Sequence, residues 1–204
     1  MHLILASASP RRRELMRLIT EEFEVITADI DERELESSLG DIPAKDVSER
    51  IARAKAEAVW STLSPSDTED AVVVAADTSV ISGDRIMGKP KDKAEAGQML
   101  TELSGKIHSV VTGVWIIKDN KGKGFSEETF VEFCPLDRFQ QETIESYIST
   151  SDPYDKAGGY GIQNGGALLV KRVNGDYFNV VGLPVMALSR ELAALEDDNR
   201  CEAW

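Results

Sequence analysis

The sequence is poor in cysteine, and the two cysteines that it has cannot build a scaffold. Cys134 and Cys201 lie far apart, and the second follows an acidic, polar stretch. Small secreted domains need several disulfides, and cysteine zinc sites need closely spaced pairs of ligands. The composition therefore excludes both classes and favours a reducing compartment.

The sequence also lacks long apolar runs and an excess of positive charge. No run approaches the ~20 apolar residues of a membrane-spanning helix, and the N-terminus lacks the charged and apolar regions of a signal peptide. We therefore expect a cytoplasmic protein. Its 23 basic and 36 acidic residues give a net charge of −13. Such a surface repels nucleic acid and anionic membranes, so neither is expected as a partner.

A run of small residues near the N-terminus leads into a helix. Ser9 is a favourable N-cap and Pro10 a favourable first helical residue, so a helix should begin at Pro10. The apolar residues 3–5 before this run predict a strand. The strand–turn–helix that results would present free N–H groups at the start of the helix.

The first turn of this helix carries three arginines where carboxylates are usual. Residues 11–13 add positive charge to a helix end that is already positive. Small residues, two serine hydroxyls and guanidinium groups together predict a binding segment for a phosphate chain, and the alternative is a solvated arginine face. The residues assigned to this segment are Ser7, Ser9, Arg11 and Arg12. In so acidic a chain, this prediction requires the basic side chains to converge: Arg11, Arg12, Arg13, Lys55, Lys89 and Lys156.

The chain is long enough for one domain, or for two lobes that share a sheet. The valine-rich run at 71–76 predicts a strand buried on both faces, with Asp77 at its C-terminal end. A second strand at 79–82 should turn at Gly83-Asp84 into residues 85–87. Further strands are expected at 23–28, 108–118 and 129–134 and in a hairpin of 167–173 with 177–181; helices at 46–63, between 92 and 105, at 137–148 and at 184–195; and loops at 29–43, 64–67 and 152–163.

Four charged residues outside the phosphate-binding segment are candidates for catalysis. Asp77 follows a buried strand, where ligand sites of α/β sheets gather. Lys55 lies at the edge of an apolar helix stripe and Lys89 follows a hairpin, although either could be an ordinary solvated lysine. Glu32 belongs to an acidic run that should mostly be solvated. If this loop folds over the phosphate-binding segment, a carboxylate of the run could bind a hard cation. His108 stands alone and is predicted to be structural.

Four separated motifs resemble those of one protein family. They are Ala6–Leu15, Ala75–Thr78, Gly88–Pro90 and Asp155–Gln163. In this order they resemble the Maf family of nucleoside triphosphate pyrophosphatases, from about Leu3 to Leu192. The resemblance implies an α/β fold in which helices flank a mixed, twisted sheet and two lobes surround a central cleft, as in ITPase-like and anticodon-binding-like architectures. It also suggests a homodimer.

The resemblance implies a reaction and roles for single residues. The family attacks between the α- and β-phosphates and releases a monophosphate and pyrophosphate, with the aspartate matched by Asp77 as the proton acceptor. It assigns active-site roles to the residues matched by Glu32, Lys55 and Lys89. With Glu32 singled out in this way, Glu32 and Asp77 together are predicted to bind Mg²⁺ or Mn²⁺ and to position a water. One position departs from the family pattern, because Asn164 replaces a glycine; asparagine tolerates the left-handed backbone region.

Three positions distinguish branches of the family. Arg11, Thr78 and Gln163 resemble the branch that acts on dTTP and UTP. A carboxamide at Gln163 can donate to a carbonyl and accept from a ring N–H, as the O4/N3–H edge of uracil or thymine requires. The prediction is a pyrophosphatase for dTTP and UTP, or for modified pyrimidine nucleotides in a house-cleaning role. The alternatives are the family's 7-methyl-GTP type and a nucleotide-binding regulator of septum formation.

The predicted domain covers residues 1–195. Residues 196–204 are expected to form an acidic C-terminal tail.

Overall fold

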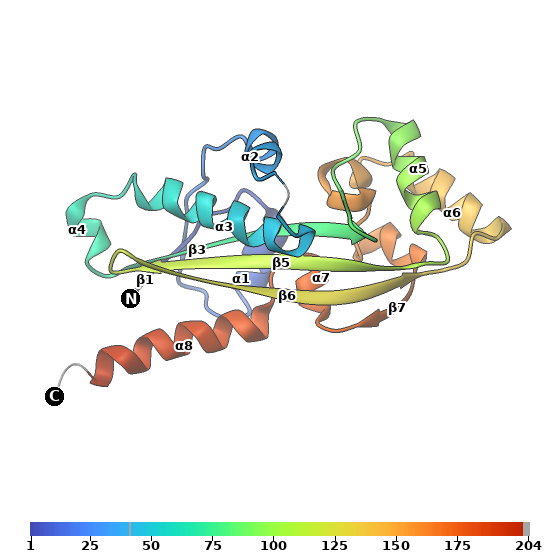
Figure 1. Cartoon of the computed structure of the whole chain (residues 1–204). Helices are drawn as coiled ribbons and strands as arrows, with labels where there is room; N and C mark the ends of the chain where they lie inside the picture. Colours follow the sequence, from blue (N-terminus) through green and yellow to red (C-terminus); the bar gives the residue numbers. More distant parts are fainter. Residues whose placement is uncertain (41, 202–204) are drawn as a thin grey trace.

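A single mixed sheet, with helices on both of its faces, organises the chain (Figure 1). The computed structural model describes residues 1–40 and 42–201. Within them the sheet has seven strands in the order β2-β1-β3-β5-β6-β7, and β4 pairs with the end of β3. The strands are β1 (His2–Leu5), β2 (Glu24–Val25), β3 (Ala71–Ser82), β4 (Arg85–Met87), β5 (Ile107–Lys118), β6 (Lys121–Phe133) and β7 (Val170–Asn174).

The sheet is parallel at one edge and antiparallel elsewhere. β1 runs parallel to both β2 and β3, whereas β3, β5, β6 and β7 form an antiparallel ladder. The β3–β5 pairing runs without interruption from Val73–Ile117 to Ile81–Ser109. This mixed sheet flanked by helices confirms the predicted α/β class.

The helices lie on both sides of this ladder. They are α1 (Pro10–Met16), α2 (Glu32–Ser38), α3 (Ala44–Trp60), α4 (Pro65–Thr68), α5 (Lys93–Leu103), α6 (Arg138–Tyr147), α7 (Tyr177–Val181) and α8 (Val185–Cys201), with 3-10 turns at Asp152–Asp155, Ala157–Gly159 and Asn164–Leu169. In Figure 1, α3 crosses the upper face of the sheet with α2 above it. The helices α5 and α6 lie at the right-hand end of the sheet, and α4 lies at its left-hand end. Within the described residues no helix is both long and apolar enough to cross a membrane.

The alternation of apolar residues along β1 and β3 supplies two hydrophobic cores on opposite faces. Ile4, Val73 and Ala75 pack with α3 residues in one core, while Leu5 and Val74 pack with residues of α1, α7 and α8 in the other. A third core joins the end of β3 to β5, β6, α5 and α6. The polar residues 77–79 of β3 lie between these cores.

The helix α3 approaches the sheet unusually closely. A Cβ atom at Gly113 of β5 would lie 2.2 Å from the backbone nitrogen of Glu49, so only glycine fits there. The Ser48 hydroxyl donates to Ser79 Oγ (2.8 Å) and to the Val111 carbonyl (3.2 Å). These contacts fix α3 against β3 and β5.

Two predictions for strands were wrong because polar residues stay in the ladder. Residues 71–82 form one strand, and Asp77, Thr78 and Ser79 pair with residues of β5. Asp77 therefore lies within a strand rather than at its end. β6 begins at Lys121 instead of Thr129, and its early glycines leave room for the Trp115 ring, which a Cβ at Gly122 would approach to 2.6 Å.

Two predicted loops contain helices. Residues 32–38 form α2, because the Asp31 carboxylate accepts the Glu34 N–H at 3.0 Å as an N-cap would. Acidic residues in its first turn also suit the helix dipole. Ser64 and Asp67 form a capping box at the start of α4.

The predicted hairpin at 167–181 was also wrong. Its first half forms β7 and its second half forms the helix α7, which Asp176 caps by accepting the Phe178 N–H at 2.8 Å. Asn179 of α7 is fully buried and donates to the Val110 carbonyl (3.0 Å) and to Thr129 Oγ1 (2.9 Å). Such tertiary contacts override strand propensity.

Two element boundaries also differ from the prediction. β2 keeps only two of the six residues expected at 23–28. The helix α8 continues to Cys201, past the predicted end at residue 195.

Candidate active site

A cavity of about 950 Å³ opens where β3 lacks a neighbouring strand. β1 pairs with β3 only as far as Val74, and β4 pairs with it only from Val80. The segment between them therefore has no strand partner on this edge within the described residues, and its Asp77 and Thr78 side chains are partly exposed. The cavity beside it is lined by every site residue predicted from the sequence: Ser7, Ser9, Arg11, Arg12, Glu32, Lys55, Asp77, Thr78, Lys89 and Gln163.

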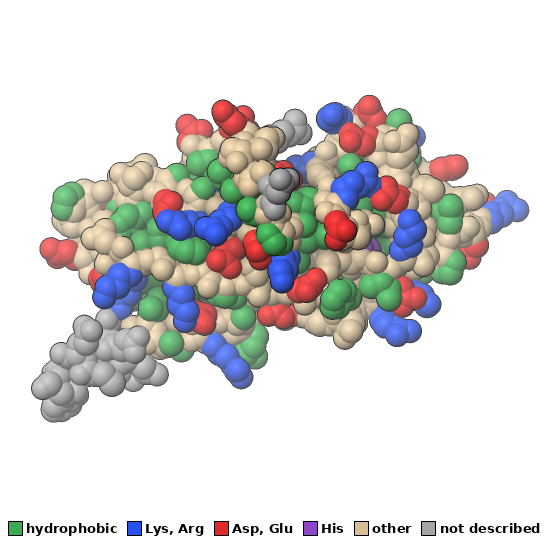
Figure 2. All heavy atoms as spheres, viewed as in Figure 1, with side chains coloured by type: hydrophobic (Ala, Val, Ile, Leu, Met, Phe, Trp, Pro, Cys, Tyr) green, Lys and Arg blue, Asp and Glu red, His purple; other side chains and the backbone are tan. Residues whose placement is uncertain are grey.

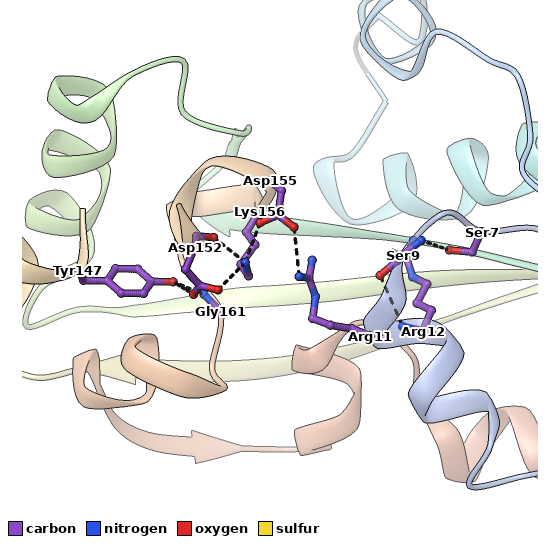
Figure 3. A network of polar contacts seen from close by, with 9 residues as sticks. All are labelled: Ser7, Ser9, Arg11, Arg12, Tyr147, Asp152, Asp155, Lys156 and Gly161. Atoms are coloured by element: carbon purple, nitrogen blue, oxygen red, sulfur yellow. Dashed lines mark hydrogen bonds and ion pairs between the residues drawn. The ribbon is translucent and has the colours of Figure 1, made fainter. Parts of the chain in front are cut away.

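The phosphate-binding segment has the predicted strand–turn–helix form. Ser9 is the N-cap of α1, with Pro10 at the first helical position. The Ser9 Oγ accepts the Arg12 N–H at 3.5 Å, and the Ser7 Oγ accepts the Ser9 N–H at 3.2 Å (Figure 3). No acidic residue occupies the first turn, so the positive helix end faces the cavity without a local counter-charge.

The first two arginines of α1 reach the cavity in different ways. Arg12 is held on both sides, because its Nε donates to the Gly182 carbonyl (2.8 Å) and its Nη2 to Thr78 Oγ1 (3.0 Å). Burial lowers the pKa of Arg12, and nearby Asp77 and Glu32 oppose that effect. Arg11 points toward the 3-10 segment across the cleft (Figure 3).

Arg13 does not join them, and its predicted convergence was wrong. It is absent from the cavity lining, and its Nε is buried without a hydrogen-bond partner in the described part of the chain. A side chain three residues into a helix turns away from the face that positions 11 and 12 share.

Lys55 joins two carboxylates. Its Nζ lies 2.7 Å from Asp77 Oδ1 and 2.7 Å from Glu32 Oε1, and its side chain is only 8% exposed. Lys89 approaches the other oxygen of Glu32 at 3.5 Å. Burial raises the pKa of Glu32, but Lys55, Lys89 and Arg12 outweigh it and hold the pKa below its usual 4.5. Both carboxylates thus contact the same ammonium group.

Glu36 was missed from the sequence. It lines the cavity one turn after Glu32 on α2. Burial and the charges of Asp77 and Glu32 raise its pKa. The spacing of four residues between the two glutamates was the available signal, and it has meaning only on a helix.

Thr78 and Gln163 line the cavity as predicted, but only Thr78 forms side-chain hydrogen bonds within the described residues. The Thr78 hydroxyl lies 2.9 Å from Thr112 Oγ1 and also accepts from Arg12. The Gln163 carboxamide has no hydrogen-bond partner among residues 1–40 and 42–201, and so remains available. The next residue, Asn164, replaces the glycine of the family pattern and has φ +53°. Asparagine tolerates this left-handed backbone region.

Charge in the cavity is mixed rather than uniformly positive. Its basic residues share it with acidic ones such as Asp152, Asp155 and Glu32. Lys156 donates to the Asp152 carbonyl (2.5 Å), Asp152 Oδ1 (3.0 Å) and Asp155 Oδ1 (2.6 Å), so its ammonium has no donor left. Acidic and basic side chains are also interspersed on the face seen in Figure 2. Of the lysines expected to converge, Lys89 is the most open, at 49% exposed.

Comparisons with known proteins agree with this geometry. The family model described as Maf-like protein matches residues 2–195. The chain is 46% identical over 191 residues to the dTTP/UTP pyrophosphatase of Bacillus cytotoxicus, covering 93% of each chain. It is 46% identical over 185 residues to that of Thermosipho africanus (91% of this chain, 88% of the relative) and 42% identical over 188 residues to that of Clostridium novyi (92% and 94%).

The solved structure of the Staphylococcus aureus Ham1 protein covers 66% of this chain and 72% of its own, with 16% identity and a TM-score of 0.42, which is a weak likeness. The assignment rests instead on the family model and on relatives that match nearly end to end. By these two measures, the chain belongs to the Maf-like family.

Proposed function

We propose that the protein is a nucleoside triphosphate pyrophosphatase that hydrolyses dTTP and UTP to the monophosphate and pyrophosphate. One observation carries the proposal: a buried lysine holds Asp77 and Glu32 beside the start of an arginine-bearing helix, in one cavity. Relatives 42–46% identical over most of this chain are dTTP/UTP pyrophosphatases, which supports the same reaction here.

The phosphate chain would bind between α1 and Lys89. Arg11 uses one of its five donors on Asp155, and Lys89 makes a single long contact, so both keep donors for phosphate oxygens. Arg12 is oriented by Gly182 and Thr78 and has donors remaining on its terminal nitrogens. In the first turn of α1 the Arg11 N–H has no partner among the described residues, and it adds one backbone donor to this anion-binding arrangement.

A divalent cation fits the donor set at this site. Mg²⁺ is commonly held by one or two carboxylates together with substrate phosphates, and Glu32 and Asp77 supply two such carboxylates. The described residues contain no group of three or more His, Cys, Asp or Glu side chains that could hold a metal. When bound, Mg²⁺ or Mn²⁺ would neutralise charge on the phosphates.

Asp77 would accept the proton of the attacking water. Its side chain is 14% exposed and its Oδ1 accepts a hydrogen bond from Lys55, which leaves the other oxygen for a water in the cavity. A positioned base of this kind contributes about 10²–10⁴-fold to a rate. Arg12 and Lys89 lie in the same cavity and would stabilise charge on the phosphates that separate.

The nucleobase of the substrate would be recognised at the Gln163 end of the cavity. The unpartnered carboxamide of Gln163 matches the paired acceptor and donor of a uracil or thymine edge. A guanine edge has the same O6/N1–H pair but adds the N2 amino donor, for which an ionised carboxylate that only accepts would be the better match. We therefore infer that Gln163, with Arg11 and Thr78, favours pyrimidine nucleotides; a cytoplasmic, homodimeric enzyme remains our prediction.

A substrate panel tests the proposal. Pyrophosphate release should be measured from dTTP, UTP, dCTP, ATP, GTP and 7-methyl-GTP, with Mg²⁺, with Mn²⁺ and with EDTA. We expect metal-dependent turnover that is fastest with dTTP and UTP. Preference for 7-methyl-GTP would support the purine-type alternative, and tight nucleotide binding without turnover would support a regulator.

A further inference from the structure

The loop that carries Gln163 is tied to the end of α6 by a tyrosine (Figure 3). The Tyr147 hydroxyl donates to Asp152 Oδ2 at 2.5 Å and accepts the Gly161 N–H at 3.0 Å. Burial and the bond to Asp152 raise the pKa of Tyr147, so the hydroxyl keeps its proton at neutral pH. Gly161 lies two residues before Gln163, and Tyr147 is therefore a direct support for the backbone that presents the carboxamide.

The same network continues across the cleft to α1. Lys156, whose side chain is 10% exposed, spends its three donors on Asp152 and Asp155. The other oxygen of Asp155 accepts from Arg11 Nη1 at 3.2 Å. Burial raises the pKa of Asp155, but Lys156 and Arg11 outweigh it and hold the pKa below its usual 3.8, so the ion pair persists at neutral pH.

The packing around this network leaves little room for adjustment. A Cβ atom at Gly166 would lie 2.0 Å from the Gly161 carbonyl oxygen and 3.1 Å from the Tyr147 hydroxyl. A Cβ at Gly161 would lie 2.7 Å from Lys156 Cε. Interiors packed this tightly transmit small displacements instead of absorbing them. A change at Tyr147 should therefore shift the segment that leads to Gln163.

We propose that Tyr147 and Asp155 are positioning residues for base selection, which act by fixing Gln163 and Arg11 from behind. One network thus sets the two sides of the cavity that the proposed function assigns to pyrimidine recognition, and the inference rests on that function. Tyr147 is not among the residues that line the cavity, and Asp155 lines it as an anion that accepts from Arg11. Their effect should appear in the ratio between nucleotides rather than as a uniform loss.

The test compares two Tyr→Phe variants. Tyr147→Phe removes the hydroxyl that serves Asp152 and Gly161. Tyr154→Phe is the matched control, because its hydroxyl lies in the same segment but donates only to the Ile148 carbonyl at 2.7 Å. Steady-state pyrophosphate release from dTTP and from GTP gives kcat and KM for each protein, and urea unfolding measures stability.

For Tyr147→Phe we expect kcat/KM for dTTP to fall ~10-fold, mainly through KM, because the partly buried Asp152 carboxylate and Gly161 N–H lose their partner. The kcat/KM for GTP should change far less, so the ratio of kcat/KM for dTTP to kcat/KM for GTP falls by nearly the same factor. Tyr154→Phe should keep the wild-type ratio even if its stability falls. Asp155→Asn holds Arg11 less firmly. Because Arg11 also keeps donors for phosphate oxygens, this variant should lower kcat/KM for both nucleotides but lower it further for dTTP, so that the ratio narrows in the same direction.

Two outcomes separate this inference from the proposed function. Preferential hydrolysis of dTTP and UTP by the wild type, with an unchanged ratio in Tyr147→Phe and Asp155→Asn, would overturn the inference and leave the function intact. A uniform loss across nucleotides would also overturn it, because it would show a merely structural role. A wild-type protein that releases pyrophosphate from none of the nucleotides would overturn both.

Discussion

Replacing Lys55 by methionine would remove the ammonium that lies between Asp77 and Glu32 while keeping a side chain of similar length. In the wild type both contacts are 2.7 Å, and the lysine is buried against β3 and β5. The variant would leave two carboxylates close together without the cation that joins them. We expect the loss to appear in stability as well as in catalysis.

The magnitude follows from the burial of the two partners. Removing one member of a buried ion pair costs about 3–5 kcal/mol. Asp77 is 14% exposed, but Glu32 is 41% exposed, so solvent screens part of its charge. We therefore expect the free energy of unfolding at pH 7 to fall by about 3 kcal/mol, at the lower end of that range.

The loss should also depend on pH. In the wild type the pKa of Glu32 is below its ordinary value of 4.5, so its stabilising contribution is present above pH 4.5 and is lost as the pH falls through the folded-state pKa. Without Lys55, burial acts against fewer cations and the pKa of Glu32 rises. The difference between variant and wild type should therefore be largest at pH 7 and should shrink in acid.

Urea unfolding followed by circular dichroism measures these quantities. Lys55→Met, Asp77→Asn and the double variant form a double-mutant cycle. The free energy of unfolding of the double variant should fall by about 1–2 kcal/mol less than the sum of the two single losses. Lys91→Met is the control, because Lys91 also lines the cavity but is exposed, and it should change stability by less than about 0.5 kcal/mol. Additive single variants, or a Lys55→Met protein as stable as the wild type, would refute the reasoning.

Three further predictions concern catalysis, selectivity and acid stability. Asp77→Asn should lower kcat for dTTP by about 10²–10⁴-fold with dTTP binding retained in calorimetry; a fully active variant would contradict the role of Asp77 as base. Gln163→Glu should lose turnover of dTTP and UTP disproportionately, because an ionised carboxylate cannot donate to O4; equal losses in a kinetic panel would count against it. Burial lowers the pKa of His108 from 6.5 to about 4, so the unfolded state binds more protons between these values. Stability should fall by up to about 3 kcal/mol as the pH drops from 6.5 to 4. Urea midpoints of His108→Gln should show a weaker dependence over this range, whereas those of His2→Gln should follow the wild type.

Much of the site could be predicted because its signals are local. Ser9 and Pro10 mark the start of α1, as Asp92 and Asp137 mark α5 and α6 by accepting a backbone N–H three residues ahead. His108 is buried against Phe133 and Tyr160, as expected for a structural histidine. The helix caps depend on residues at most three positions apart, so a single sequence suffices to find them, whereas the ring partners of His108 are distant in the sequence.

The parts that could not be predicted depend on distant partners. Thr78 stays in a strand because Thr112 pairs with it, and α7 forms because Asn179 finds buried partners on β5 and β6. Lys156 is a cation by sequence, but two aspartates occupy its donors. Such strand pairs, buried hydrogen bonds and occupied lysine donors depend on the tertiary structure, and the pattern of residues along the chain does not predict them.

The uninterrupted ladder of β3 with β5 has a mechanical consequence. It passes beneath the cavity from Val73–Ile117 to Ile81–Ser109, so the floor of the site has no hinge: bending it would break several strand hydrogen bonds at once. A hinge motion that closes two lobes over the cavity is therefore disfavoured. Because the segment that begins at Asp152 is itself tightly packed, adjustment to a ligand must come mainly from the wall formed by α2, while the floor keeps Asp77 still.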